Sequence, residues 1–120
     1  MGQSESRLRI TNSDGVAQVR FIDRNILDEA NIQQIGDEIA QVIEASPSPR
    51  ILICFENVDH LSSAALGTLI TINNKVRNKG GQLRLSNIDP QIYEVFVITK
   101  LHKLFEIHPT ADEALGSFRK

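Results

Sequence analysis

The run of five apolar residues from Ile51 to Phe55 constrains the fold more than any other segment of the chain. It shows no alternation of polar and apolar residues and is too short for an independent helix. It therefore predicts a strand that is covered on both faces. Amphipathic helical patterns lie on either side of this run. Because strands that alternate with helices pair in parallel through right-handed crossovers, we expect an α/β sheet with this strand near its centre.

The segment before this strand combines a hairpin pattern with a helical pattern. Residues that alternate between apolar and polar flank the turn sequence Asn12–Gly15, which is typical of a β-hairpin at the edge of a sheet. From Asp28 the apolar residues recur at helical spacing, and the pattern stops before the breaker Ser46–Pro49. The sequence therefore predicts a helix from about Asp28 to Ala45.

The second half of the chain repeats the alternation of helix and strand. Ser62 and Ser63 open a second helical pattern, which Gly80-Gly81 ends, and the strand Gln82–Ser86 follows. Asp89-Pro90 predicts the start of a short third helix. Its inward face is expected to consist of Ile92, Val95 and Phe96. The remaining predicted elements are a strand over Leu104–Ile107 and a last helix that starts at the capping box Thr110–Glu113.

These elements follow one another in the order β-β-α-β-α-β-α-β-α. We expect a mixed sheet of about five strands with about four helices, in a single domain over residues 1–120 whose first six residues form a flexible start.

The formal net charge of −2 disfavours a nucleic-acid partner. The single cysteine, Cys54, has no disulfide partner in the chain and is interpreted as a buried apolar group, which fits a reducing compartment. With no apolar run of about 20 residues and no secretory signal, we expect a cytoplasmic protein without membrane association.

The sequence shows no pattern that is typical of an enzyme. His60, His102 and His108 form no metal-type pair with one another or with Cys54, and Gly80-Gly81 lacks the lysine and hydroxyl residue of a phosphate-binding loop. No nucleophile, base and orienting residue stand at a recognisable spacing. We therefore expect no catalytic residue, metal or cofactor. Asp28 is interpreted mainly as a stabiliser of a helix start.

The segment Val58–Gly67 is the strongest candidate for a functional site. In an α/β sheet the carboxyl end of a strand and the start of the next helix form the functional rim. One of the two serines, Ser62 or Ser63, is expected to cap the helix. The small residues that follow leave its first turn bare, either for close packing on the sheet or for the approach of another protein.

The order and spacing of several short motifs resemble the STAS domain of bacterial anti-sigma factor antagonists. The resemblance covers nearly the whole chain and is carried by the following segments: Val58–Gly67, Lys75–Arg77, Gly80–Leu83, Ile88–Pro90, Glu94–Phe96, Thr99–Leu101, Leu104–Ile107 and Asp112–Leu115. It implies a binding module, not an enzyme, that regulates transcription by binding an anti-sigma factor that is also a serine kinase. Phosphorylation of a helix-start serine would end that binding. The alternative is a scaffold subunit of a stress-signalling assembly, which would bind other STAS proteins without phosphate control at this site.

The chain departs from the family's pattern at the acceptor position. The family's usual sequence is Asp-Ser-Ser-Gly-Leu-Gly with the second serine modified, and Ala64 occupies that place here. Either a neighbouring hydroxyl, Ser63 or Ser62, accepts the phosphate, or the module has no such control. The resemblance and the expected rim together predict a partner-binding surface with these members: Asp23, Asn25, Asp59, His60, Ser62, Ser63, Ala64 and Gly67.

Overall fold

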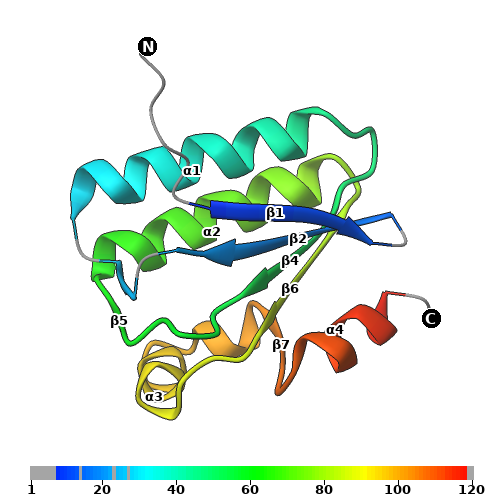
Figure 1. The fold of residues 1–120 in the computed structure, drawn as a ribbon. Coiled ribbons are helices and arrows are strands. Elements are labelled where there is room, and N and C mark those ends of the chain that lie inside the picture. The colour runs from blue at the N-terminus through cyan, green and yellow to red at the C-terminus, as the bar shows by residue number, and fades with distance from the viewer. Residues whose placement is uncertain (1–7, 14, 23, 27, 119–120) are drawn as a thin grey trace.

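A five-stranded mixed sheet forms the centre of the structure (Figure 1). The computed structural model describes residues 8–13, 15–22, 24–26 and 28–118. The strands lie in the order β1 (Leu8–Ser13), β2 (Val16–Phe21), β4 (Arg50–Cys54), β6 (Gln82–Ser86) and β7 (Glu106–His108). β1 is antiparallel to β2, whereas every other neighbouring pair in this sheet is parallel. The predicted α/β class, edge hairpin and central strand are confirmed.

Four α-helices of the described part cover the two faces of this sheet. They are α1 (Glu29–Glu44), α2 (Ser63–Asn78), α3 (Pro90–Ile98) and α4 (Ala111–Ser117). Figure 1 shows α1 and α2 side by side on one face. The buried residues of α3, Ile92 and Phe96, belong to the core on that face, whereas Ala114 of α4 packs in a smaller cluster on the opposite face. The carboxylate of Asp28 accepts the Ala30 N–H at 2.8 Å and begins α1, so the predicted role of this residue is confirmed. No helix among the described residues is long and apolar enough to span a membrane.

The central strand β4 separates two buried layers. Ile51 and Ile53 belong to the large core under α1 and α2, whereas Leu52 packs in a smaller cluster with Ala114 and Phe118 of the α4 segment. Successive side chains of a strand point to opposite faces, so a strand between two buried layers has no polar face. This accounts for the absence of alternation in the sequence of β4.

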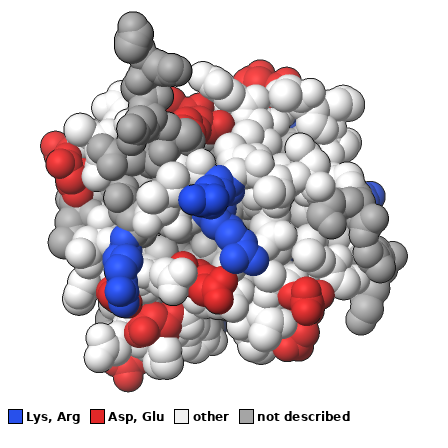
Figure 2. Space-filling model, in the orientation of Figure 1, with Lys and Arg blue, Asp and Glu red and all other residues white. Residues whose placement is uncertain are grey.

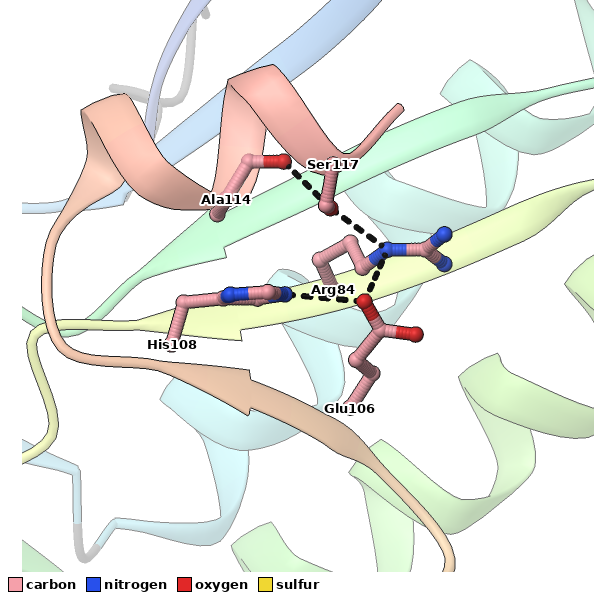
Figure 3. Close-up of polar contacts among 5 residues, drawn as sticks. All are labelled: Arg84, Glu106, His108, Ala114 and Ser117. Atoms are coloured by element: carbon pink, nitrogen blue, oxygen red, sulfur yellow. Dashed lines mark hydrogen bonds and ion pairs between the residues drawn. The ribbon is translucent and has the colours of Figure 1, made fainter. Parts of the chain in front are cut away.

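Polar contacts of Arg84 attach α4 to the sheet (Figure 3). The Arg84 Nε donates to Ser117 Oγ at 2.9 Å and lies 2.8 Å from Glu106 Oε2, and the guanidinium lies 4.7 Å from the centre of the Phe118 ring. His108 Nε2 approaches the same Glu106 oxygen at 2.8 Å. The charge of Arg84, whose side chain is only 13% exposed, is therefore both paired and stacked.

The connection between α2 and β6 is held by close backbone packing. Gly80 has a φ of +73°, which favours glycine, and a Cβ at Gly81 would overlap the carbonyl oxygen of Pro49. That oxygen accepts the Gln82 N–H at 2.8 Å. The predicted helix stop at Gly80-Gly81 is thus also the point where this connection meets the segment that leads into β4.

Two details of the third helix and the last strand were predicted wrongly. Val95 is 41% exposed, and the inward face of α3 consists of Ile92 and Phe96. Phe96 packs edge-on against Phe105, with ring centres 5.9 Å apart, and this contact turns the neighbouring Val95 away from the core. The last strand begins at Glu106, not at Leu104, because the 3₁₀ turn η1 (Leu101–Lys103) occupies the preceding segment.

Candidate protein-docking site

A pair of two-residue strands joins the two loops at the carboxyl end of the sheet. β3 (Asn25–Ile26) runs parallel to β5 (His60–Leu61), with Asn25 opposite His60. The Asp59 N–H donates to the Arg24 carbonyl at 2.7 Å, and the Ser62 N–H donates to the Ile26 carbonyl at 3.1 Å. The segment after β2 is therefore fixed against the segment that leads into α2. The sequence analysis missed both strands, since two residues are too few to show alternation.

Ion pairs link the end of β2 and the segment after it to the segment that follows β4. Arg24 Nε and Nη2 both lie 3.0 Å from Asp59 Oδ2, and Arg20 Nη1 lies 3.0 Å from Glu56 Oε1. Figure 2 shows basic and acidic side chains next to one another on this side of the molecule, without a continuous field of either sign. A partner that uses the Asp59 carboxylate must therefore compete with Arg24.

Ser62 is the N-cap of α2. Its backbone is extended, its hydroxyl oxygen accepts the Ala65 N–H at 3.2 Å, and its carbonyl accepts the Leu66 N–H at 3.1 Å. Its residue surface is half-buried. Ser62 therefore carries the capping role that the sequence left open between the two serines.

The small residues of the first turns of α2 divide between the two sides of the helix. Ala65 and Leu66 are buried in the main core, whereas Ser63, Ala64 and Gly67 are exposed. A Cβ at Gly67 would meet no atom within 4 Å, so solvent borders the helix backbone there. Close packing on the sheet accounts for Ala65 but leaves Ala64 and Gly67 unexplained.

The structure brings most of the predicted surface residues onto one edge of the molecule. Seven of the eight are described: Asn25 on β3, Asp59 and His60 at β5, Ser62 at the cap, and Ser63, Ala64 and Gly67 on α2. We call these seven residues the docking rim. The eighth, Asp23, lies outside the described residues. Asn25 and His60 meet through the β3–β5 pair, and the others follow along the chain.

The rim holds hydroxyl, amide, imidazole and carboxylate groups but no metal-type cluster. No group of three or more His, Cys, Asp or Glu side chains that could hold a metal ion occurs in the part of the chain described. The electrostatics at the start of α2 differ from those of the other helices. α1, α3 and α4 begin with a carboxylate at the cap or in the first turn, whereas α2 has a serine cap and no acidic residue in its first turn. Neither the cap nor the first turn of α2 therefore carries an acid that would neutralise the positive end of its dipole.

Comparison with known proteins identifies the family. The family model of the STAS domain matches residues 8–114, from the first strand into the last helix. The chain belongs to the STAS domain family. It is similar to BtrV of Bordetella bronchiseptica, a candidate anti-sigma factor antagonist, with 24% identity over 96 residues that cover 80% of this chain and 82% of BtrV.

Two solved structures share the fold of this STAS domain. An anti-sigma factor antagonist (STAS) domain protein of Planctomyces limnophilus matches with a TM-score of 0.87 and 20% identity over 94% of this chain and 98% of that chain. The Bacillus cell fate determinant SpoIIAA in its phosphorylated form matches with a TM-score of 0.70 and 18% identity over 92% and 98% of the two chains. At these identities the likeness establishes the fold alone.

Proposed function

We propose that this STAS domain is an anti-sigma factor antagonist that binds an anti-sigma factor through the docking rim. The observation that carries the proposal is the open face of α2, where Ser63, Ala64 and Gly67 are exposed beside the β3–β5 pair. Small exposed side chains at a helix start allow a partner to approach the backbone closely. Similarity to BtrV supports the choice of an anti-sigma factor as that partner.

The proposed role is binding, not catalysis. The rim presents groups that suit hydrogen bonding to a protein surface, and the described residues offer no metal cluster to activate water. When this protein binds the anti-sigma factor, the sigma factor would be released, and the protein would in this way regulate transcription. The protein would act in the cytoplasm, where sigma factors meet RNA polymerase.

We further propose that phosphorylation of Ser63 by a kinase activity of the anti-sigma factor ends binding. Two neighbouring features support Ser63 over Ser62. The Ser62 oxygen already accepts the Ala65 N–H, whereas the exposed Ser63 hydroxyl makes no hydrogen bond within the described part of the chain. A related fold, SpoIIAA of Bacillus, is known in a phosphorylated form.

The proposed switch acts on the docking surface and leaves the fold intact. A phosphoserine carries about −1.5 to −2 charges at neutral pH. The amino end of α2, which has no acid at its cap or in its first turn, stabilises such an anion, so the folded state tolerates it. A partner surface shaped for a small neutral hydroxyl loses contacts and must desolvate the charge. A cost of about 2 to 3 kcal/mol would weaken binding by roughly 30- to 150-fold.

Calorimetric titration against each purified anti-sigma factor kinase of the source organism tests the proposal. Wild-type protein is expected to bind one of them, Ser63→Glu to bind at least about 30-fold more weakly, and Ser63→Ala to bind nearly as well as wild type. The matched control is Ser48→Glu, which places the same charge on an exposed serine in the loop before β4. Binding to none of the kinases would overturn the proposed function.

Incubation with the binding kinase and ATP, followed by mass spectrometry, tests the modification separately. We expect a phosphate on Ser63 of the wild-type protein and no phosphate in the Ser63→Ala variant. Binding that persists in Ser63→Glu, together with no phosphate on either serine, would refute the switch. That outcome would favour the alternative function, a scaffold subunit of a stress-signalling assembly without phosphate control at this site.

A further inference from the structure

Exposed apolar side chains concentrate on α3 and the turn that follows it. Of the seven large hydrophobic residues that are exposed in the described part, five lie between residues 93 and 104: Tyr93, Val95, Val97, Ile98 and Leu104. Ile98 is 78% exposed, more than any other of the seven. A continuous stretch of exposed apolar residues in a small domain is typical of an interaction surface. None of these residues belongs to the docking rim.

The outer face of α3 is formed by neighbouring positions on the helix. Ile92 and Phe96 face the core, so Tyr93, Glu94, Val97 and Ile98 fall on the side that points away from it. Ile92 and Phe96 pack in the same core as α1 and α2, and Figure 1 shows α3 at the periphery of the molecule. The outer face therefore holds three apolar side chains and one carboxylate, with the exposed Gln91 at its start.

The charges of this face are complementary to those of a second copy of the same face. Glu94 and Lys100 are exposed, and neither has an ion-pair partner among the described residues. Each lies three positions from Val97, on opposite sides along the chain. Two α3 helices that pack antiparallel with Val97 at the two-fold axis would place Glu94 of each copy near Lys100 of the other.

We propose that α3 is the interface of a homodimer of this chain, with two antiparallel α3 helices that meet at Val97. The apolar contacts come from Tyr93, Val97 and Ile98, and the two Glu94–Lys100 pairs fix the direction of packing. Lys100 follows Thr99, the C-cap of α3, and its φ of +64° turns the chain away from the helix directly beyond the apolar face. One short helix per copy makes a small interface, so we expect a dissociation constant of about 10 to 100 µM.

Sedimentation equilibrium of the full chain tests the homodimer. Wild type is expected to shift from monomer to dimer over about 1 to 300 µM, and Val97→Glu to raise the dissociation constant at least about 10-fold, since it places two carboxylates at the axis. Ile22→Glu is the matched control, because Ile22 is 51% exposed but lies after β2. Wild type that stays monomeric at the highest concentration would overturn the proposal, as would a dimer that Val97→Glu does not weaken.

A charge exchange keeps the proposal testable even where Val97→Glu fails to fold, which circular dichroism would show. Glu94→Lys alone and Lys100→Glu alone are each expected to weaken self-association several-fold. An equimolar mixture of these two variants restores both ion pairs and should form a mixed dimer of near wild-type strength. If the mixture associates no better than either variant alone, the antiparallel pairing is wrong.

The homodimer proposal and the proposed function can be tested, and refuted, independently of each other. Ser63→Glu should leave the dimer dissociation constant unchanged, because Ser63 lies on α2. If wild type stays monomeric while Val97→Glu weakens binding to the anti-sigma factor, α3 belongs to the partner's interface, which contradicts a homodimer.

Discussion

The hydroxyl oxygen of Ser62 accepts the Ala65 N–H at 3.2 Å, whereas the side chain of the adjacent Ser63 is exposed. Two serines that the sequence presents as equivalent therefore have different roles. Ser62 stabilises the start of α2, and Ser63 is available to a partner or to a modifying enzyme. A mutation of Ser62 should therefore affect the stability of the fold, whereas a mutation of Ser63 should affect the proposed docking.

Ser62→Ala should lower the free energy of unfolding by about 1 kcal/mol, because it leaves the Ala65 N–H without its cap. Ser63→Ala should change this free energy by less than about 0.5 kcal/mol, as is usual for exposed positions. Urea denaturation followed by circular dichroism measures both. Equal losses for the two variants would contradict the assignment of Ser62 as the cap.

Gly67→Ala should stabilise the fold but weaken docking. Position 67 lies inside α2 with free space around it, and alanine is favoured over glycine in a helix by about 0.5 to 1 kcal/mol. The added methyl group would protrude from the docking rim toward a partner. Thermal unfolding and titration with the anti-sigma factor measure the two effects. A variant that is more stable and binds as tightly as wild type would remove Gly67 from the interface.

Gly81→Ala should destabilise the fold by at least about 2 kcal/mol, since its Cβ would overlap the Pro49 carbonyl oxygen. The Gln82 N–H donates to that oxygen, so any shift that relieves the overlap also disturbs the start of β6. The matched control is Gly116→Ala, where a Cβ meets nothing within 4 Å. Denaturation midpoints compare the two. A similar loss in both variants would argue against backbone contact as the cause.

Lys79→Met should destabilise the fold by about 0.5 to 1.5 kcal/mol. The Lys79 ammonium donates to the carbonyls of Ile43 at 3.1 Å and Glu44 at 3.3 Å, at the end of α1, whose last turn holds no basic residue. Lys75→Met is the control, an exposed lysine inside α2, the helix whose C-cap is Lys79. Unfolding in low and high salt measures the effect, and the loss at Lys79 should shrink as salt screens the charge. A loss at Lys75 as large as that at Lys79 would refute the capping contact.

The sequence predicted those parts of the fold that depend on local signals. The caps at Asp28 and Asp89 and the capping box at Thr110 mark helix starts that the structure confirms. Each cap bonds to an N–H only two or three residues away, so the signal is contained in a few consecutive residues. The unbroken apolar run of β4 likewise predicted its burial on both faces.

Contacts between distant segments decided what the sequence alone did not. The β3–β5 pair exists because residues 35 positions apart meet at the edge of the sheet, and Val95 is exposed because Phe96 packs against Phe105. The order of the five strands of the main sheet and the four helices, and the small, hydroxyl-rich start of α2, were determined by the sequence itself. Which serine caps that helix, and which small residues face solvent, depended on the rotation of α2 about its own axis relative to the sheet. That rotation is set by the shapes of core side chains from many segments, and no local pattern encodes it.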